Sequence, residues 1–354
     1  MRVLACQSPY GHGGVGQHFA HLVRETDDGV GLAHYFNPAP DPAHGARGRA
    51  LTDRPYQWLY RWTPLRYSLG WSSYVKNDLF DRRVAAALEA PAERFMGFVG
   101  QALHSFQRAE TLGFERLELV AVNSHVNNVR RLHDRAEAAW GHRGASWLNE
   151  WQRRKTLAEY DRADRIFVHS NYTRDSFLAA GIPAHKLERT YLRPDPRFVP
   201  PPERPEDGIF RVVYVGRVDV TKGLPVLLEA FASLPDPAEL TIVGGWPTRR
   251  MKQFMQEWTA REPRLRMAPG DPLPALHAAD VFVHPSYEDG FGYAPMEALA
   301  CGVPVVVTED TGMKEYVQEG TNGYVVPTGD VEALRDRLHH LRRHPLRPAP
   351  LAIA

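Results

Sequence analysis

Two cations follow a short apolar run in the second half of the chain. In VVYVGRVDVTKGLPVLLEAF, Arg217 comes directly after a predicted strand, and Lys222 lies five positions later, just before a helix whose apolar face begins at Leu224. Both therefore stand at the carboxyl end of a strand, the edge where open α/β sheets bind ligands. An Arg fork and a compact Lys charge suit a diphosphate and can neutralise it as a leaving group. Either cation alone is equally compatible with a solvated surface residue.

A second informative segment is VFVHPSYEDGFGYAPMEALACGVPVVVTED. A strand is expected to end at His284, and a glycine-containing loop then leads into a helix that starts near Ala294. The backbone amides expected to converge on an anion are those of Phe291, Gly292, Tyr293 and Ala294. Glu297, expected in about the first turn of this helix, can accept hydrogen bonds from a ribose 2′,3′-diol. Alternatively, Glu297 only stabilises the helix N-terminus.

Residues 11–16 read GHGGVG and fit the dinucleotide pattern G-x-G-x-x-G between a strand and a helix. About 20 residues further on, where that pattern requires a ribose-binding acid, the chain reads GLAHYFNP and has none. A dehydrogenase is therefore disfavoured. Glycines still let a backbone approach a ligand closely, so Gly13 and Gly14 are predicted contacts, with a tight turn that binds nothing as the alternative.

Apolar runs that fit buried parallel strands alternate with segments of helical periodicity, which favours doubly wound α/β units. The predicted strands are 3–6, 117–122, 165–169, 210–215, 240–243, 281–284 and 303–307. Six prolines between residues 193 and 207 exclude a helix or a central strand there. We therefore predict a first domain over 1–195, a linker over 196–208, a second domain over 209–340 and a tail over 341–354.

Composition excludes several classes of protein. The 354 residues carry a formal net charge of +1, which gives no global field for nucleic acid or an anionic membrane. The two cysteines, Cys6 and Cys301, lie in apolar contexts far apart, as expected of free thiols in a reducing compartment. No run of about 18 apolar residues occurs, and the opening residues MRVLACQSP lack the long apolar core expected of a signal peptide. A cytoplasmic protein is expected, with no transmembrane segment and with peripheral membrane contact left open.

Four segments resemble glycosyltransferase family 4, a retaining family with the GT-B fold. They are VGRVDVTKG, LTIVGG, ADVFVHPSYEDGFGYAPMEALACGVPVVV and TNGYVVPTGD, in an order and spacing that cover most of residues 210–330. The first half agrees more loosely, through GGVG and a strand that leads to His125. The resemblance implies two Rossmann-like domains that face each other across a deep cleft. The first would bind the acceptor, and the second a nucleotide-sugar donor.

The resemblance also implies roles for individual residues. Arg217 and Lys222 correspond to the family's diphosphate ligands, and Glu297 to the second of two glutamates spaced by eight positions. The first of that pair falls at Asp289, with Glu288 one position too early, so the acid expected to contact the donor sugar is either one methylene shorter or displaced here. His125 is assigned near the reacting centre, with a structural loop histidine as the alternative.

The implied reaction is transfer of a hexosyl group from a UDP- or GDP-linked donor to a hydroxyl of a glycan, lipid-linked or small-molecule acceptor, with retention and without a metal or other cofactor. The shortened acid leaves two alternatives. One is a weak or inactive protein that binds sugar nucleotides or glycans, and the other is a GT-B epimerase that acts on a nucleotide-sugar.

Residues 36–72 are rich in proline and aromatic residues and show no clear periodicity. The aromatic residues are Trp58, Tyr60, Trp62, Tyr67 and Trp71. Either their rings stack on sugars of an acceptor, or they fill a small core of an irregular insertion.

Overall fold

A computed structural model describes residues 1–27, 31–142 and 144–351. The chain forms two compact units. The first contains residues 1–130 and 146–192, and the second contains residues 131–145 and everything from residue 193 on. Each unit is built on one parallel sheet, as the alternation of strands and helices predicts.

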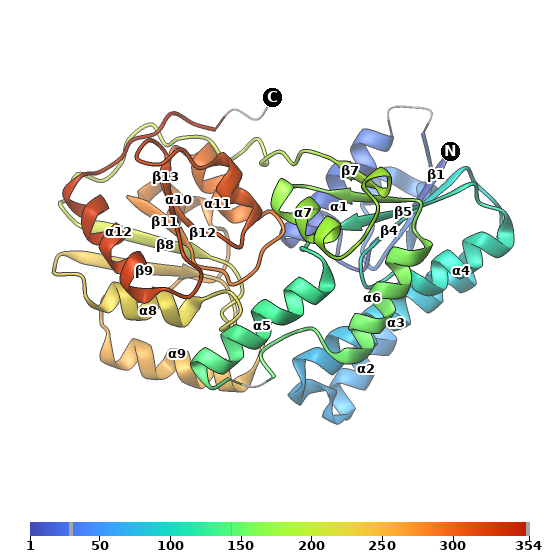
Figure 1. Cartoon of the computed structure of the whole chain (residues 1–354), viewed down its shortest axis with the longest axis horizontal. Helices are drawn as coiled ribbons and strands as arrows, with labels where there is room; N and C mark the ends of the chain where they lie inside the picture. Colours follow the sequence, from blue (N-terminus) through green and yellow to red (C-terminus); the bar gives the residue numbers. More distant parts are fainter. Residues whose placement is uncertain (28–30, 143, 352–354) are drawn as a thin grey trace. The chain divides into compact units, whose positions relative to one another are not determined.

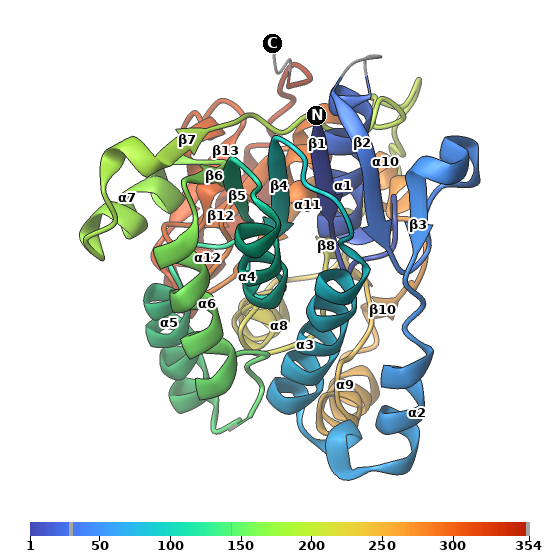
Figure 2. The ribbon, with the colours of Figure 1, turned by 90° about the vertical axis from the view of Figure 1, so that its right-hand side faces the viewer.

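The first unit has a seven-stranded sheet in the order β3-β2-β1-β4-β5-β6-β7. Its strands are β1 (Arg2–Ala5), β2 (Leu32–Asn37), β3 (Gly48–Ala50), β4 (Arg94–Phe98), β5 (Arg116–Ala121), β6 (Arg165–Val168) and β7 (Leu187–Arg189). Its helices are α1 (Gly13–Thr26), α2 (Arg54–Trp62), α3 (Leu69–Ala87), α4 (Leu103–Leu112), the start of α5 (Val126–Trp140), α6 (Glu150–Arg162) and α7 (Asn171–Ala179), with 3-10 segments η1 (Pro42–Arg47), η2 (Pro64–Tyr67) and η3 (Ala184–Lys186). Helix α1 covers one face of the sheet, and α3, α4 and α6 lie side by side on the other (Figure 2).

The second unit has a six-stranded sheet in the order β10-β9-β8-β11-β12-β13. Its strands are β8 (Phe210–Val215), β9 (Ala238–Val243), β10 (Leu265–Met267), β11 (Val281–His284), β12 (Val305–Thr308) and β13 (Gly323–Val326). Its helices alternate with these strands along the chain and are α8 (Leu224–Ala232), α9 (Arg249–Arg261), α10 (Leu273–Ala278), α11 (Tyr293–Ala300) and α12 (Val331–Arg343), with the 3-10 segment η4 (Gly312–Tyr316) after β12. Helices α8, α9 and α12 cover one face, and α10 and α11 the other (Figure 1). Every residue of β11 and β12 is buried, as expected of parallel strands covered on both faces.

The boundaries of the two units differ from the predicted domain boundaries at one segment. Residues 131–145 belong to the second unit, because Ala136 and Ala145 join its core and Trp140 donates its indole hydrogen to the Tyr287 hydroxyl at 3.1 Å. The described part of the tail also packs there, where the Leu351 amide donates to the Leu299 carbonyl.

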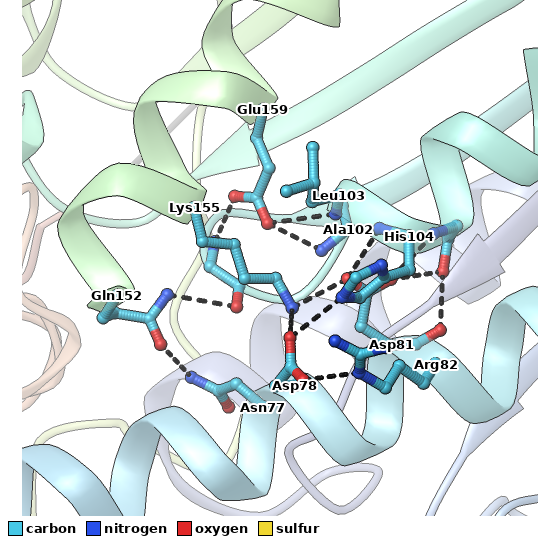
Figure 3. A network of polar contacts seen from close by, with 12 residues as sticks. Asn77, Asp78, Asp81, Arg82, Ala102, Leu103, His104, Gln152, Lys155 and Glu159 are labelled. Atoms are coloured by element: carbon cyan, nitrogen blue, oxygen red, sulfur yellow. Dashed lines mark hydrogen bonds and ion pairs between the residues drawn. The ribbon is translucent and has the colours of Figure 1, made fainter.

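Two buried carboxylates hold the start of α4 in the first unit (Figure 3). Asp81 on α3 accepts hydrogen bonds from the amides of His104 and Ser105, each at 2.9 Å. Glu159 on α6 accepts one from the Ala102 amide at 2.9 Å. Both carboxylates therefore occupy the helix N-terminus, where amide hydrogens need acceptors and the helix dipole favours negative charge.

The buried cation Lys155 offsets part of this negative charge. Its Nζ lies 2.8 Å from Asp81 Oδ2 and 3.0 Å from Asp78 Oδ1 (Figure 3). Burial acts to raise the pKa of Asp78, but Lys155 and Arg82 outweigh it and lower the pKa to about 2. Lys155 thus links α6 to α3.

We expect Lys155→Met to lower the free energy of unfolding by about 3–5 kcal/mol, because it leaves buried carboxylates without their cation. Urea unfolding at pH 7 measures the change. The neighbouring Arg154→Met is the matched control, since the Arg154 side chain is 69% exposed and its ion pair with Glu150 is screened by solvent, so we expect a much smaller loss. Equal losses in the two variants would contradict the importance of the buried network.

Candidate functional site in the second unit

The loops after β8 and β11 meet at one edge of the second sheet, because these strands are neighbours. Gly223 has a φ of +69°, and a Cβ there would lie 1.8 Å from the Pro285 carbonyl oxygen. Only glycine permits this approach. The Tyr287 amide also donates to the Thr221 carbonyl at 2.9 Å. The two loops therefore form one continuous surface at the carboxyl ends of the strands.

Asp219 organises the first loop. Its Oδ1 accepts hydrogen bonds from the amides of Thr221 and Lys222 at 2.8 and 3.0 Å, and its Oδ2 pairs with Nε of Arg217. Burial acts to raise the pKa of Asp219, but the Arg217 charge and the Thr221 hydroxyl lower it overall. Asp219 was not predicted as a site residue, although an Asp two positions before a Thr is a turn signal. Asp219 fixes the direction of Arg217, whose side chain is one-third exposed.

Lys222 reaches the second loop. Its Nζ lies 2.8 Å from Asp289 Oδ2 and 3.3 Å from the Glu288 carbonyl oxygen. The same Asp289 oxygen lies 3.1 Å from Nε2 of His284, a residue that the sequence analysis placed only at a strand end. Burial acts to raise the pKa of Asp289, but Lys222 and His284 lower it to well below its usual range. The structure thus brings two predicted site residues, Lys222 and Asp289, into direct contact.

The remaining predicted donor contacts surround the start of α11. Gly292 precedes the helix with a φ of +96°, and a Cβ there would lie 3.6 Å from His284 Nε2. Phe291 and Gly292 are buried, whereas Tyr293 and Ala294 are half-buried. The helix begins at Tyr293, so its first turn adjoins the Asp289 and His284 side chains.

Glu297 is 5% exposed and lies in the second turn of α11, not in about the first turn as predicted. The helix dipole acts on charges mainly within the first turn. Stabilisation of the helix N-terminus, the alternative raised for Glu297, is therefore disfavoured. A role as a hydrogen-bond acceptor remains a prediction.

The predicted residues of the first unit follow β1 and β5. His125 is 3% exposed, its ring contacts those of Tyr160 and Phe177, and its Nδ1 accepts from the Asn127 amide at 3.3 Å. Burial and, to a smaller extent, the charge of Arg153 lower the pKa of His125 to about 4. These contacts favour the structural interpretation of His125 over a role near the reacting centre.

Gly13 and Gly14 begin α1 and are exposed. A side chain at Gly13 would meet no atom within 4 Å, although its φ of +63° favours glycine. By contrast, a Cβ at Gly16 would lie 2.2 Å from the Pro9 carbonyl oxygen. Gly16 is thus required by packing, and the space beside Gly13 is open to a ligand.

In the part of the chain that the structure describes, no group of three or more His, Cys, Asp or Glu side chains is arranged to hold a metal ion. No helix there is long and apolar enough to cross a bilayer. Cys6 and Cys301 are free and buried, as predicted.

Comparisons with known proteins agree with this geometry. Residues 199–349 match the family model of "Glycosyl transferases group 1". A GDP-mannose-dependent alpha-(1-6)-phosphatidylinositol monomannoside mannosyltransferase of Mycolicibacterium smegmatis is 35% identical over 54% of this chain and 56% of its own length. O-antigen chain mannosyltransferase B of Escherichia coli is 36% identical over 34% of each chain. The matches thus span from about a third to about half of the length of these curated relatives.

Solved structures resemble the chain over nearly its whole length. Sucrose-phosphate synthase of Thermosynechococcus elongatus has a TM-score of 0.73 at 20% identity and covers 98% of this chain and 90% of its own. Anabaena HepE in complex with UDP and glucose has a TM-score of 0.70 at 17% identity. The match covers 97% of this chain and 90% of HepE. These likenesses confirm the predicted fold, with two Rossmann-like domains.

We expect Asp289→Asn to lower the free energy of unfolding at pH 7 by about 2 kcal/mol, because a charged hydrogen bond to Lys222 is weakened. The folded-state pKa of Asp289 lies below its unfolded value of about 3.9. The contribution of the ionised pair is therefore complete above pH 4 and is lost as the pH falls from there towards the folded-state pKa. Urea unfolding should give the same difference in free energy of unfolding between the wild type and Asp289→Asn at pH 7 and pH 5. At pH 3 this difference should be smaller.

Asp236→Asn is the control for this series, because the Asp236 side chain is 82% exposed and pairs with Arg264 at 3.3 Å. We expect it to change the free energy of unfolding by less than about 0.5 kcal/mol. If Asp289→Asn also changes the free energy of unfolding at pH 7 by less than about 0.5 kcal/mol, the pair with Lys222 does not stabilise the fold.

Proposed function

We propose that this chain is a retaining glycosyltransferase, because residues 199–349 match the family model of "Glycosyl transferases group 1". It moves a hexosyl group from a UDP- or GDP-linked donor to an acceptor hydroxyl. The observation that carries the proposal is the placement of Arg217, Lys222 and Asp289 on two joined loops at one sheet edge. The names of the relatives support both donor classes, since one is GDP-mannose-dependent and HepE is in complex with UDP.

The two cations bind the donor diphosphate. Arg217 is held by Asp219 with its side chain one-third exposed, and Lys222 is about one-fifth exposed. As the bond between sugar and phosphate breaks, negative charge grows on the leaving phosphate, and preorganised cations stabilise it. In the structure Lys222 Nζ bonds to Asp289, so a bound phosphate shares or replaces that contact.

The carboxylates bind hydroxyl groups of the donor. Asp289, kept ionised by Lys222 and His284, accepts hydrogen bonds from the sugar. Its Oδ2 lies 2.8 Å from Lys222 Nζ. Glu297 accepts hydrogen bonds from the ribose diol. The amides at the start of α11, from Phe291 to Ala294, contact the diphosphate. In the first unit, Gly13 and Gly14 stay predicted donor contacts.

The reaction needs no metal in this proposal, because Arg217 and Lys222 supply the positive charge that a cation would bring to the leaving group. The acceptor is a glycan, a lipid-linked saccharide or a small molecule, and the first unit binds it. A cytoplasmic location fits a sugar-nucleotide donor and stays a prediction.

We expect Arg217→Gln and Lys222→Gln each to weaken the binding of UDP or GDP by about tenfold to a hundredfold, because charged hydrogen bonds contribute about 1.5–3 kcal/mol. Isothermal titration against UDP, GDP and their sugars identifies the base and measures the loss. Arg266→Gln is the control, since Arg266 lies on β10 in the same unit and is 65% exposed. Unchanged affinity in both site variants would refute the diphosphate site.

We expect transfer, or slow hydrolysis of the donor without an acceptor, to continue in excess EDTA. NMR of the product's anomeric proton then reports whether the configuration is retained. Abolition by EDTA with rescue by Mn²⁺ would overturn the metal-free proposal. Tight nucleotide binding with neither transfer nor hydrolysis would instead indicate a non-catalytic binding protein.

A further inference from the structure

Large aromatic side chains are exposed together in one region of the first unit. They lie on α2, on η2 and at the starts of α3 and α6. The exposed fractions are 63% for Trp58, 37% for Tyr60, 66% for Trp62, 63% for Tyr67, 44% for Trp71 and 55% for Trp151. The alternative that the first five of these rings fill a small core of their own is therefore wrong. Exposed aromatic groups of this size usually mark an interaction site.

Helix α2 is anchored to α3 through the side that carries Tyr56. Tyr56 is 9% exposed, and its hydroxyl lies 2.6 Å from the Ser72 Oγ on α3. Because 3.6 residues make one turn, Trp58 and Trp62 share the side that faces away from Tyr56. Figure 2 shows α2 at one end of α3. The anchored side thus holds both indole rings towards solvent.

Cations accompany these rings. Arg54 and Arg61 fall on the same side of α2 as Trp58 and Trp62, by the same helical spacing. The Arg66 guanidinium lies 4.8 Å from the centre of the Tyr67 ring. Between residues 54 and 77 the sequence has three Arg and one Lys and no Asp or Glu, whereas the whole chain has a net charge of only +1. This surface therefore attracts anions.

We propose that the aromatic-basic surface, formed by the six exposed rings with Arg54, Arg61 and Arg66, binds the interfacial region of an anionic lipid bilayer. Trp and Tyr rings favour the boundary between headgroups and acyl chains. Each Arg near an anionic leaflet contributes about 1 kcal/mol. A neutral glycan could stack on the rings and accept hydrogen bonds from the arginines, but it carries no negative charge, so charge complementarity favours the bilayer. The proposal concerns where the protein sits and goes beyond the transfer reaction.

Sedimentation with vesicles tests the surface. We expect the full chain to bind vesicles of phosphatidylcholine with 30% phosphatidylglycerol at least tenfold more tightly than vesicles of phosphatidylcholine alone. The double variant Trp58→Ser, Trp62→Ser should lose at least tenfold in affinity for the anionic vesicles. Trp246→Ser is the matched control, because Trp246 is a 41% exposed tryptophan of the second unit, and it should change the affinity by less than twofold.

A charge variant separates the two components of binding. Arg54→Gln, Arg61→Gln, Arg66→Gln should lower the affinity for anionic vesicles to the value for neutral ones and should remove its dependence on salt. In brominated anionic vesicles the fluorescence of the wild type should be quenched more than that of the double Trp variant. Thermal unfolding midpoints and nucleotide affinities that match the wild type show that fold and donor site are intact.

Three outcomes would overturn the proposal. The first is no preference of the wild type for anionic vesicles. The second is equal vesicle binding by the wild type and both surface variants. The third is loss of binding to soluble oligosaccharides in the double Trp variant while vesicle binding stays unchanged, which would assign the rings to a glycan. None of these results depends on transferase activity, so failure here is distinguishable from failure of the donor site.

Discussion

The close approach of Gly223 to the Pro285 carbonyl is the constraint on which the candidate donor site depends. It is possible because β8 and β11 are adjacent in the sheet although about 65 residues separate them along the chain. At this position the strand order reverses direction, which leaves a crevice at the carboxyl ends of the strands. The contact brings Lys222 from one loop within hydrogen-bonding distance of Asp289 from the other. Together with the hydrogen bond from the Tyr287 amide to the Thr221 carbonyl, it keeps the two charges on one joined surface.

Charge balance around these loops explains why the groups can remain ionised in a partly buried place. Asp219 neutralises Arg217 and also accepts two backbone amides, so its carboxylate is stabilised from several directions. Asp289 is stabilised in the same way by Lys222 and His284. Each cation thus has a carboxylate that limits its motion and yet leaves part of its side chain accessible. Such preorganisation lowers the cost of binding a charged ligand.

Much of the second unit could be predicted from the sequence, because its strands are short apolar runs between turn residues. Residues 210–215 and 281–284 were predicted with the observed bounds. Strands β2, β3, β4, β7, β10 and β13 were not predicted, since each contains a charged residue, a histidine or a glycine that interrupts its apolar run. The role of His284 was also missed, because its contact with Asp289 depends on how the loop folds back. The transfer of residues 131–145 to the other unit likewise rests on tertiary packing alone.

Because residues 131–145 belong to it, the second unit is discontinuous in the chain. Its interior takes Ala136 and Ala145 from a segment that is synthesised before the last two strands of the first sheet, β6 and β7. A fragment that starts at residue 193 would therefore lack part of its hydrophobic interior and expose the surfaces of Tyr287 and Phe254 that Trp140 and His142 contact. During synthesis Trp140 must wait for 147 further residues before its partner Tyr287 exists. The two halves of this protein are thus not separable modules that evolution or an engineer could exchange by cutting at the proline-rich linker.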